Sequence, residues 1–85
     1  MRIYDLKQRE VINIRDGSRI GYVSDIAIDS EEGTVATLIV PSATKLFGML
    51  AAEQEYHIPW EKVKQIGDDV LLVDCESSKL LVNAD

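Results

Sequence analysis

His57 is the only histidine of the chain, and its side chain type is the one best suited to acid–base catalysis or metal binding near neutral pH. Either chemistry would need a carboxylate or a thiol beside the ring. His57 precedes Ile58 in a strand-like segment, which favours a structural or surface histidine. No GxSxG motif surrounds any serine, so a nucleophilic hydrolase is poorly supported. We therefore predict no catalytic residue and a protein that is not an enzyme.

The residues that could hold a metal or a cofactor are equally sparse. Cys75 is a lone cysteine, so we expect no internal disulfide and no zinc site, and interpret it as a small buried hydrophobe. The acidic pairs Glu31-Glu32 and Asp68-Asp69 could hold a cation weakly, but they lack the alternating ligands of a calcium loop. The five glycines form neither a P-loop nor a dinucleotide fingerprint. We expect no metal and no cofactor.

The composition is that of one ordinary soluble domain: 85 residues, 46% hydrophobic and 28% charged. No apolar run is long enough for a membrane span or a signal peptide, so we expect a cytoplasmic protein with no membrane partner. The net charge of −6 opposes nucleic-acid binding. The charge is uneven, since the first 23 residues hold five cations and three carboxylates (+2) and the remainder sums to −8. Such polarity could orient a partner or a second copy, or could be only a lopsided solvated surface.

The first half of the chain indicates three consecutive antiparallel strands. Residues 10–14 are rich in β-branched side chains and lead into Asp16-Gly17, a strong hairpin-turn signal. Residues 20–29 alternate in polarity, and Gly21 fits a bend or bulge where a small barrel turns a corner. A second turn, 30–33, leads to the strand 34–41.

The second half is less regular. Residues 42–55 indicate a long loop with one helical turn. A short strand follows at 56–59, where Pro59 stops it, and Trp60 opens a turn in which Val63 and Ile66 point inward. Gly67 begins the next reversal. The run 70–73 is continuously apolar, which predicts cover on both faces, and residues 80–82 could add an edge strand.

These elements predict an all-β fold: a small closed six-stranded β-barrel in a single domain, with the barrel over about residues 9–76 and a tail over 77–85. Closure would remove exposed strand edges. The interior is expected to be filled by branched side chains, without a ligand cavity. The predicted interior residues are Ile20, Tyr22, Ile26, Ile28, Leu38, Val40, Ile58, Val63, Ile66, Leu71 and Val73.

Two apolar features allow a binding interpretation. Trp60 could stack on a ligand, but tryptophan after proline at a barrel corner favours a plug that closes one end. The segment 46–50 places four large apolar side chains in a loop, where they could form a partner contact or fold back as a lid. The candidate contact residues are Leu46, Phe47, Met49 and Leu50, and the residues given a structural role are Gly17, Gly21, Pro59, Trp60 and Gly67.

The stretches RDGSRIGYVSDIAID and YHIPWEKVKQIGDDVLLV resemble the PRC-barrel domain, and in particular its short stand-alone YlmC/YmxH branch associated with endospore-forming bacteria. The resemblance covers residues 3–76. The more specific motif is Ile58-Pro59-Trp60, Val63, Ile66-Gly67 and Asp69. The family implies a six-stranded barrel that serves as a binding or assembly module, without a shared catalytic residue.

Three functions are compatible with these observations. The first is an interaction module for another, unidentified protein or for a second copy, with a homodimer favoured and a link to sporulation implied by the resemblance. The second is a regulatory barrel that binds a small molecule or cation through the acidic turns and His57. The third, an RNA-associated factor by analogy with the family member RimM, is opposed by the acidic charge.

Overall fold

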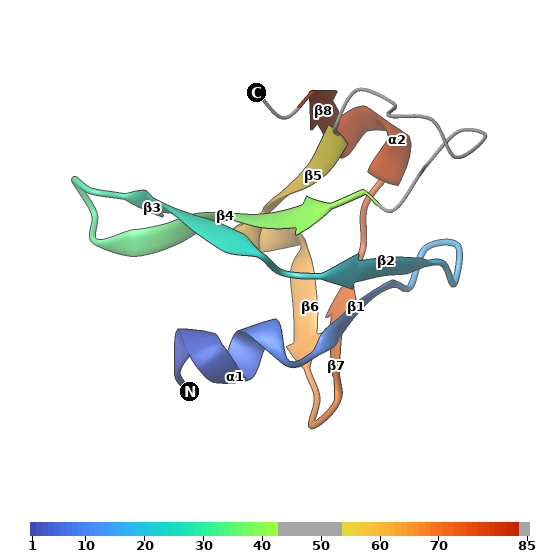
Figure 1. The fold of residues 1–85 in the computed structure, drawn as a ribbon, viewed down its shortest axis with the longest axis horizontal. Coiled ribbons are helices and arrows are strands. Elements are labelled where there is room, and N and C mark those ends of the chain that lie inside the picture. The colour runs from blue at the N-terminus through green and yellow to red at the C-terminus, as the bar shows by residue number, and fades with distance from the viewer. Residues whose placement is uncertain (43–53, 84–85) are drawn as a thin grey trace.

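The computed structural model describes residues 1–42 and 54–83. Within these residues, eight strands form two four-stranded sheets, in the orders β2-β1-β7-β6 and β3-β4-β5-β8 (Figure 1). The first sheet contains β1 (Glu10–Asn13), β2 (Arg19–Tyr22), β6 (Val63–Ile66) and β7 (Val70–Val73), and the second contains β3 (Asp25–Asp29), β4 (Thr34–Pro41), β5 (Gln54–Pro59) and β8 (Leu81–Asn83). The other described elements are the helices α1 (Ile3–Lys7) and α2 (Ser77–Leu80) and the 3-10 turn η1 (Trp60–Lys62).

The all-β prediction is confirmed, but the prediction of a closed six-stranded barrel is wrong. Each sheet keeps its own edges, β2 and β6 in one and β3 and β8 in the other, and no ladder joins the two sheets among the described strands. The larger strand number has two sources. The predicted strand 20–29 is divided into β2 and β3, and the segment after Trp60 forms the strand β6 rather than a turn.

The division between β2 and β3 follows from a local distortion at Gly21. The pairing of β1 with β2 shifts by one residue between Val11 and Ile12, which marks a bulge, and Gly21 has a φ of 136°. A Cβ at Gly21 would lie 3.2 Å from Cγ1 of Val40, so β2 and β4 approach closely here. Val23 is buried beyond the bulge. The chain thus passes from one sheet to the other, as a corner-forming glycine predicts.

The turn predicted at Asp16-Gly17 is present and joins β1 to β2. The Asn13 N–H donates to the Ser18 carbonyl and the Gly17 N–H donates to the Asn13 carbonyl, both at 2.8 Å. Gly17 has a φ of 74°, in the left-handed region that favours glycine. Pro59 and Gly67, which are also predicted to end strands, do so. β5 ends at Pro59, and the Gly67 N–H donates to the Val70 carbonyl at 2.8 Å in the β6–β7 turn.

β1 pairs in parallel with β7, from Glu10 beside Val70 to Asn13 beside Val73, and this pair is central in its sheet. In β7, Leu71 and Val73 are buried while Val70 and Leu72 are only half-buried. The prediction that the apolar run 70–73 is covered on both faces is therefore only partly correct, because the second face of this sheet is only partly shielded from solvent.

The core lies between the two sheets and combines predicted and unpredicted residues. Three of the predicted interior residues, Tyr22, Ile28 and Ile66, are exposed because they lie beyond the bulge of β2, on the outer part of the β3–β4 hairpin and on the edge strand β6, respectively. Ile26 and Val63 are half-buried at the margin. The buried apolar residues are Leu6, Val11, Ile20, Val23, Leu38, Val40, Ile58, Leu71, Val73 and Cys75.

Trp60 does not form the expected plug. It opens η1 with 38% of its surface exposed, and η1 contains no buried residue. Because η1 turns the chain away from β5 and towards β6 after Pro59, the indole stays at the margin of the core.

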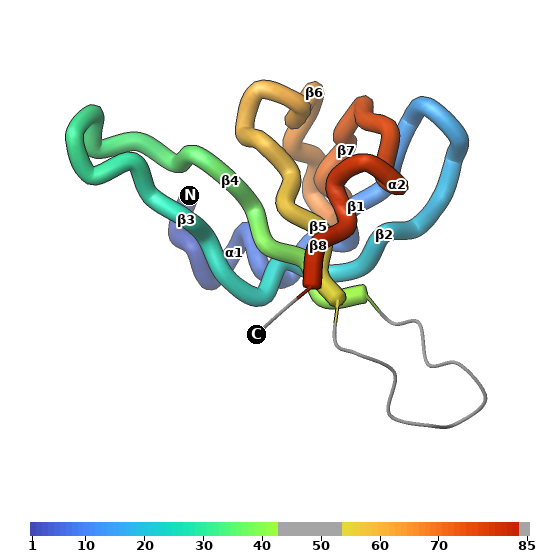
Figure 2. The backbone as a smooth tube through the Cα atoms, turned by 90° about the horizontal axis from the view of Figure 1, so that it is seen from above, coloured from blue at the N-terminus to red at the C-terminus, as the bar shows by residue number. Residues whose placement is uncertain are grey.

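The hairpin of β3 and β4 extends to one end of the molecule in both views, and α1 occupies the same end (Figures 1 and 2). The β1–β2 connection lies at the opposite end. α1 is fixed to the core by Leu6, its one buried residue. No helix in the two described ranges has the length and apolar character needed to cross a membrane.

Candidate interaction surfaces

His57 lies on β5, with its Nε2 2.8 Å from Oε1 of Glu55. Residues two apart on a strand share one face, so this pairing could have been found from the sequence, where it was missed. Within the described part of the chain, no third ligand accompanies the pair. Residues 1–42 and 54–83 contain no group of three or more histidine, cysteine, aspartate or glutamate side chains that could hold a metal ion.

The acidic turn 30–33 is organised by Asp29. Oδ1 of Asp29 accepts hydrogen bonds from the backbone N–H groups of Glu31 at 3.0 Å and Glu32 at 3.2 Å. This is the local pattern by which aspartate stabilises a turn. The carboxylates of Glu31 and Glu32 form no ion pair with another described residue, so the hairpin tip is negatively charged.

On β3, the edge strand of its sheet, Oδ1 of Asp25 accepts a hydrogen bond from the backbone N–H of Ile26 at 2.8 Å. A side chain thus satisfies a main-chain donor that could otherwise pair with an added strand. Charged side chains on edge strands commonly limit such pairing.

A buried amide connects the ends of β1 and β7. Nδ2 of Asn13 donates to the Cys75 carbonyl at 2.8 Å, while Oδ1 of Asn13 accepts from the Cys75 N–H at 3.3 Å and from the Arg15 N–H at 3.1 Å. Asn13 is fully buried, and its side chain continues the β1–β7 pairing beyond the last strand residues. Sequence reasoning missed Asn13, although it shares the parity of buried Val11.

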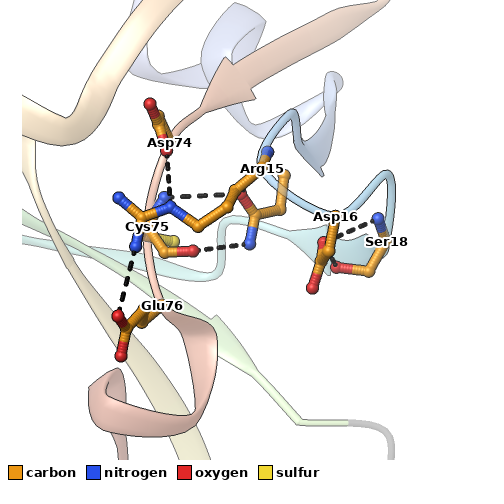
Figure 3. A network of polar contacts seen from close by, with 7 residues as sticks. Arg15, Asp16, Ser18, Asp74, Cys75 and Glu76 are labelled. Carbon is orange, nitrogen blue, oxygen red and sulfur yellow. Dashed lines mark hydrogen bonds and ion pairs between the residues drawn. The ribbon is translucent and has the colours of Figure 1, made fainter.

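Arg15, which follows Asn13, forms the centre of an ion-pair network (Figure 3). Its Nε lies 2.9 Å from Oδ1 of Asp74 and its Nη1 3.5 Å from Oε1 of Glu76. The other oxygen of Glu76, Oε2, lies 3.1 Å from Nζ of Lys79. Burial raises the pKa of the Cys75 thiol, which lies between the two acids in the chain, and the thiol is therefore neutral and unreactive at pH 7.

Asp16 and Ser18 close the neighbouring turn (Figure 3). The hydroxyl of Ser18 donates to Oδ1 of Asp16 at 2.7 Å and its backbone N–H donates to the same oxygen at 2.9 Å. The hydroxyl bond, followed by the backbone bond, lowers the pKa of Asp16 from its ordinary 3.8 because both stabilise the charged carboxylate.

A pocket of about 240 Å³ lies beside this network and is called the corner pocket below. Its cations come from three separate segments: Arg15 from the β1–β2 connection, Lys62 from η1 and Lys79 from α2. The remaining lining residues are Cys75, Glu76 and Leu80. Half of the six lining residues are thus cations, on a chain that is acidic overall.

The clustering of arginine in the first 23 residues does not produce one basic surface. Nε of Arg9 donates to the Gly67 carbonyl, and Nε of Arg19 lies 3.3 Å from Oε1 of Glu10. With Arg15 bound to Asp74, three of the four arginines have partners within the fold. Most of the N-terminal arginines that could have favoured RNA binding therefore bind partners within the fold.

Two segments at one end of the molecule carry exposed apolar side chains, and together they are called the hairpin end: Met1, Ile3 and Tyr4 at and before α1, and Ile28 on β3. These four side chains are between 54% and 71% exposed. Arg2 and Lys7 are exposed beside them and form no ion pair with another described residue. The contact predicted from Leu46, Phe47, Met49 and Leu50 lies outside the described residues.

Comparison with known proteins identifies the family to which this chain belongs. Residues 1–79 match the model of the PRC-barrel domain. The chain belongs to the PRC-barrel family. The resemblance identified from the sequence is thereby confirmed, and the match covers the buried amide, the hairpin end and all of the corner-pocket lining except Leu80.

Three relatives of this PRC-barrel chain are similar over most of their length. The probable sporulation protein YlmC of Bacillus subtilis is 32% identical over 71 residues, which are 84% of this chain and 88% of YlmC. An uncharacterized protein of Clostridium acetobutylicum is 36% identical over 80 residues, 94% of this chain and 88% of that protein. The uncharacterized protein YmxH of Bacillus subtilis is 28% identical over 76 residues, 87% of this chain and 88% of YmxH.

Proposed function

We propose that this PRC-barrel chain is a non-enzymatic assembly module that pairs with a second copy of itself through the hairpin end. The observation that carries the proposal is that one end of the molecule holds four exposed apolar side chains together with charges of both signs that form no ion pair within the described residues. Large apolar side chains grouped at one end of a small domain typically mark a protein contact. A metal-dependent activity finds no ligand cluster in residues 1–42 and 54–83.

The charges favour a second copy as the partner. Arg2 and Lys7 flank the apolar side chains of α1, and Glu31 and Glu32 lie at the hairpin tip beyond Ile28. A two-fold axis would place α1 of one copy against the hairpin of the other, and would do so twice, because the same surface is used on both sides. Each such contact would combine apolar burial with opposite charges.

The oligomeric state tests this arrangement. Light scattering across a dilution series is expected to show a dimer that dissociates when Ile28→Asp places a carboxylate among the apolar side chains. Ile14→Asp is the matched control, because Ile14 is also exposed, at 49%, but lies in the β1–β2 connection at the opposite end. A monomer at every concentration, or equal weakening by both variants, would contradict the proposal.

A charge exchange makes the test specific. Glu31→Lys/Glu32→Lys makes both contacting surfaces positive, and Arg2→Glu/Lys7→Glu makes both negative, so each variant alone is expected to be a monomer. An equimolar mixture should form a heterodimer, since both of its contacts join opposite charges. If the mixture stays monomeric, or if only L46D/F47D disrupts the wild-type dimer, the hairpin end is not the interface.

The cellular setting is proposed from the relatives. YlmC is named a probable sporulation protein, and we place the assembly role of this chain in endospore formation. Immunoblots over a sporulation time course of the native host should show the protein rising after the onset of sporulation. A level unchanged between vegetative and sporulating cells would contradict this assignment.

A further inference from the structure

The corner pocket combines features of an anion site. Arg15, Lys62 and Lys79 contribute three positive charges, whereas Glu76 is the one carboxylate that lines it. Adding Asp74, which is paired with Arg15, and Asp16, whose charge also acts on Cys75, brings the sum to zero while Glu76 stays in place. This balance is local, because the whole chain carries −6.

Glu76 already occupies part of this site as an internal carboxylate. Its two oxygens contact Arg15 and Lys79, at 3.5 Å and 3.1 Å. The side chains of these three residues are between 47% and 76% exposed, and exposed ion pairs of this kind hold their partners weakly. An external anion could therefore displace Glu76 into solvent at little cost.

Lys62 is the cation that Glu76 does not engage. It is half-buried in η1 and forms no ion pair with any residue in 1–42 or 54–83. A carboxylate has two oxygens and satisfies two of the three cations. A phosphate group has more oxygens and carries up to two negative charges, so it can contact all three, and arginine suits its geometry particularly well.

We propose that the corner pocket binds a phosphate group, carried by inorganic phosphate or by a small phosphate monoester, and that Glu76 competes with it for the same cations. With Glu76 turned outward, the three cations against Asp74 and Asp16 leave an excess of +1 to attract the anion. Cys75 and Leu80 supply an apolar lining that limits competition from water. This inference does not depend on the self-association of the hairpin end.

Amide NMR titrations at constant ionic strength test the proposal with three probes: inorganic phosphate, glycerol phosphate and acetate. Both phosphates should give saturable shifts at Arg15, Glu76 and Lys79, whereas acetate should give none that saturate. Tighter binding of the ester than of inorganic phosphate would identify a phosphorylated small molecule as the ligand, and the reverse order would identify free phosphate.

Single substitutions assign the roles. Lys62→Ala should weaken phosphate binding about threefold to tenfold, in the range expected for one charge-assisted contact. Lys64→Ala is the matched control, since Lys64 is exposed on β6 and does not line the pocket. Glu76→Gln should strengthen binding, while Glu61→Gln, which removes the same charge outside the pocket lining, should leave it nearly unchanged.

Three results would overturn the inference: no saturable shift with either phosphate, equal weakening by Lys62→Ala and Lys64→Ala, or no gain of affinity with Glu76→Gln. Thermal unfolding of each variant verifies that it is folded. If Glu76→Gln unfolds, Lys79→Ala takes its place and is expected to weaken binding. The dissociation constant should also rise below about pH 6, where phosphate monoesters lose their second charge.

Discussion

The β1–β7 pair and the hairpin end of this small protein differ in how they place their side chains. Around the β1–β7 pair, apolar residues are buried, and the buried amide of Asn13 has a partner for both its donor and its acceptor. At the hairpin end, Met1, Ile3, Tyr4 and Ile28 remain exposed, and the charges of this end form no ion pair with another described residue. The contrast indicates that the first region maintains the fold, whereas the second is free to serve a partner.

Truncation of one large side chain in each region should give the largest difference. Leu71→Ala removes a fully buried side chain from β7, and we expect it to lower the free energy of unfolding by about 2 to 5 kcal/mol. Ile28→Ala should lower it by less than about 0.5 kcal/mol, because the side chain is already exposed. Urea unfolding of the monomer at low concentration measures both. Similar losses would remove the distinction between the two regions.

Loss of the buried amide should be nearly as severe. Asn13→Ala leaves the N–H and carbonyl of Cys75 without their partner, and the expected cost is about 2 to 4 kcal/mol by the same measurement. Ser18→Ala, which removes an exposed hydroxyl bond in the same connection, is the control and should have a small effect. A cost below that of Ser18→Ala would show that water replaces the amide.

Two glycines sharpen the comparison further. Gly21→Ala places a Cβ 3.2 Å from Val40 Cγ1 at a φ of 136°, and should cost about 1 to 3 kcal/mol. Gly33, at the hairpin end, also has a positive φ, of 70°, but open space around it, so Gly33→Ala should cost only about 1 kcal/mol. Thermal melts compare the two. The reverse order would indicate that β2 and β4 can separate at the bulge.

The smallest expected effect is on acid stability. Because the pKa of Asp16 is lowered on folding, its carboxylate favours the folded state above its ordinary pKa, and this contribution is lost as the pH falls through the lowered value. Ser18→Ala should return the pKa of Asp16 towards 3.8 and flatten the acid dependence slightly. Carboxyl-detected NMR measures the pKa directly, and an unchanged value would assign the shift to another group.

Much of this architecture could be predicted from local chemistry. Asp16-Gly17, Gly21 and Pro59 each act through their own backbone, so their turn, bulge and strand end are visible in the sequence. The absence of a closed barrel could not be predicted. It depends on where β2 ends, and the sequence Val23-Ser24 carries no turn signal there. Ile28 has the correct parity for the core, but parity does not show how far a hairpin extends beyond the core.

The interaction surfaces were harder to foresee for the same reason. Arg15, Lys62 and Lys79 belong to three segments that only tertiary structure brings together, and each is an ordinary surface cation in the sequence. Asn13 differs, since its position two residues after buried Val11 was a signal that could have been used. The arginine count suggested a basic surface, yet the carboxylates and carbonyls that neutralise it come from distant parts of the chain.

The Asp25 carboxylate at the β3 edge has a consequence for the size of any assembly. Since it engages the Ile26 N–H, strand-by-strand growth that would string molecules into a fibre is disfavoured at this edge. Copies meeting through side-chain surfaces related by a two-fold axis consume those surfaces and stop at two. The side chain of Asp25 thus works against open-ended polymer growth at the β3 edge.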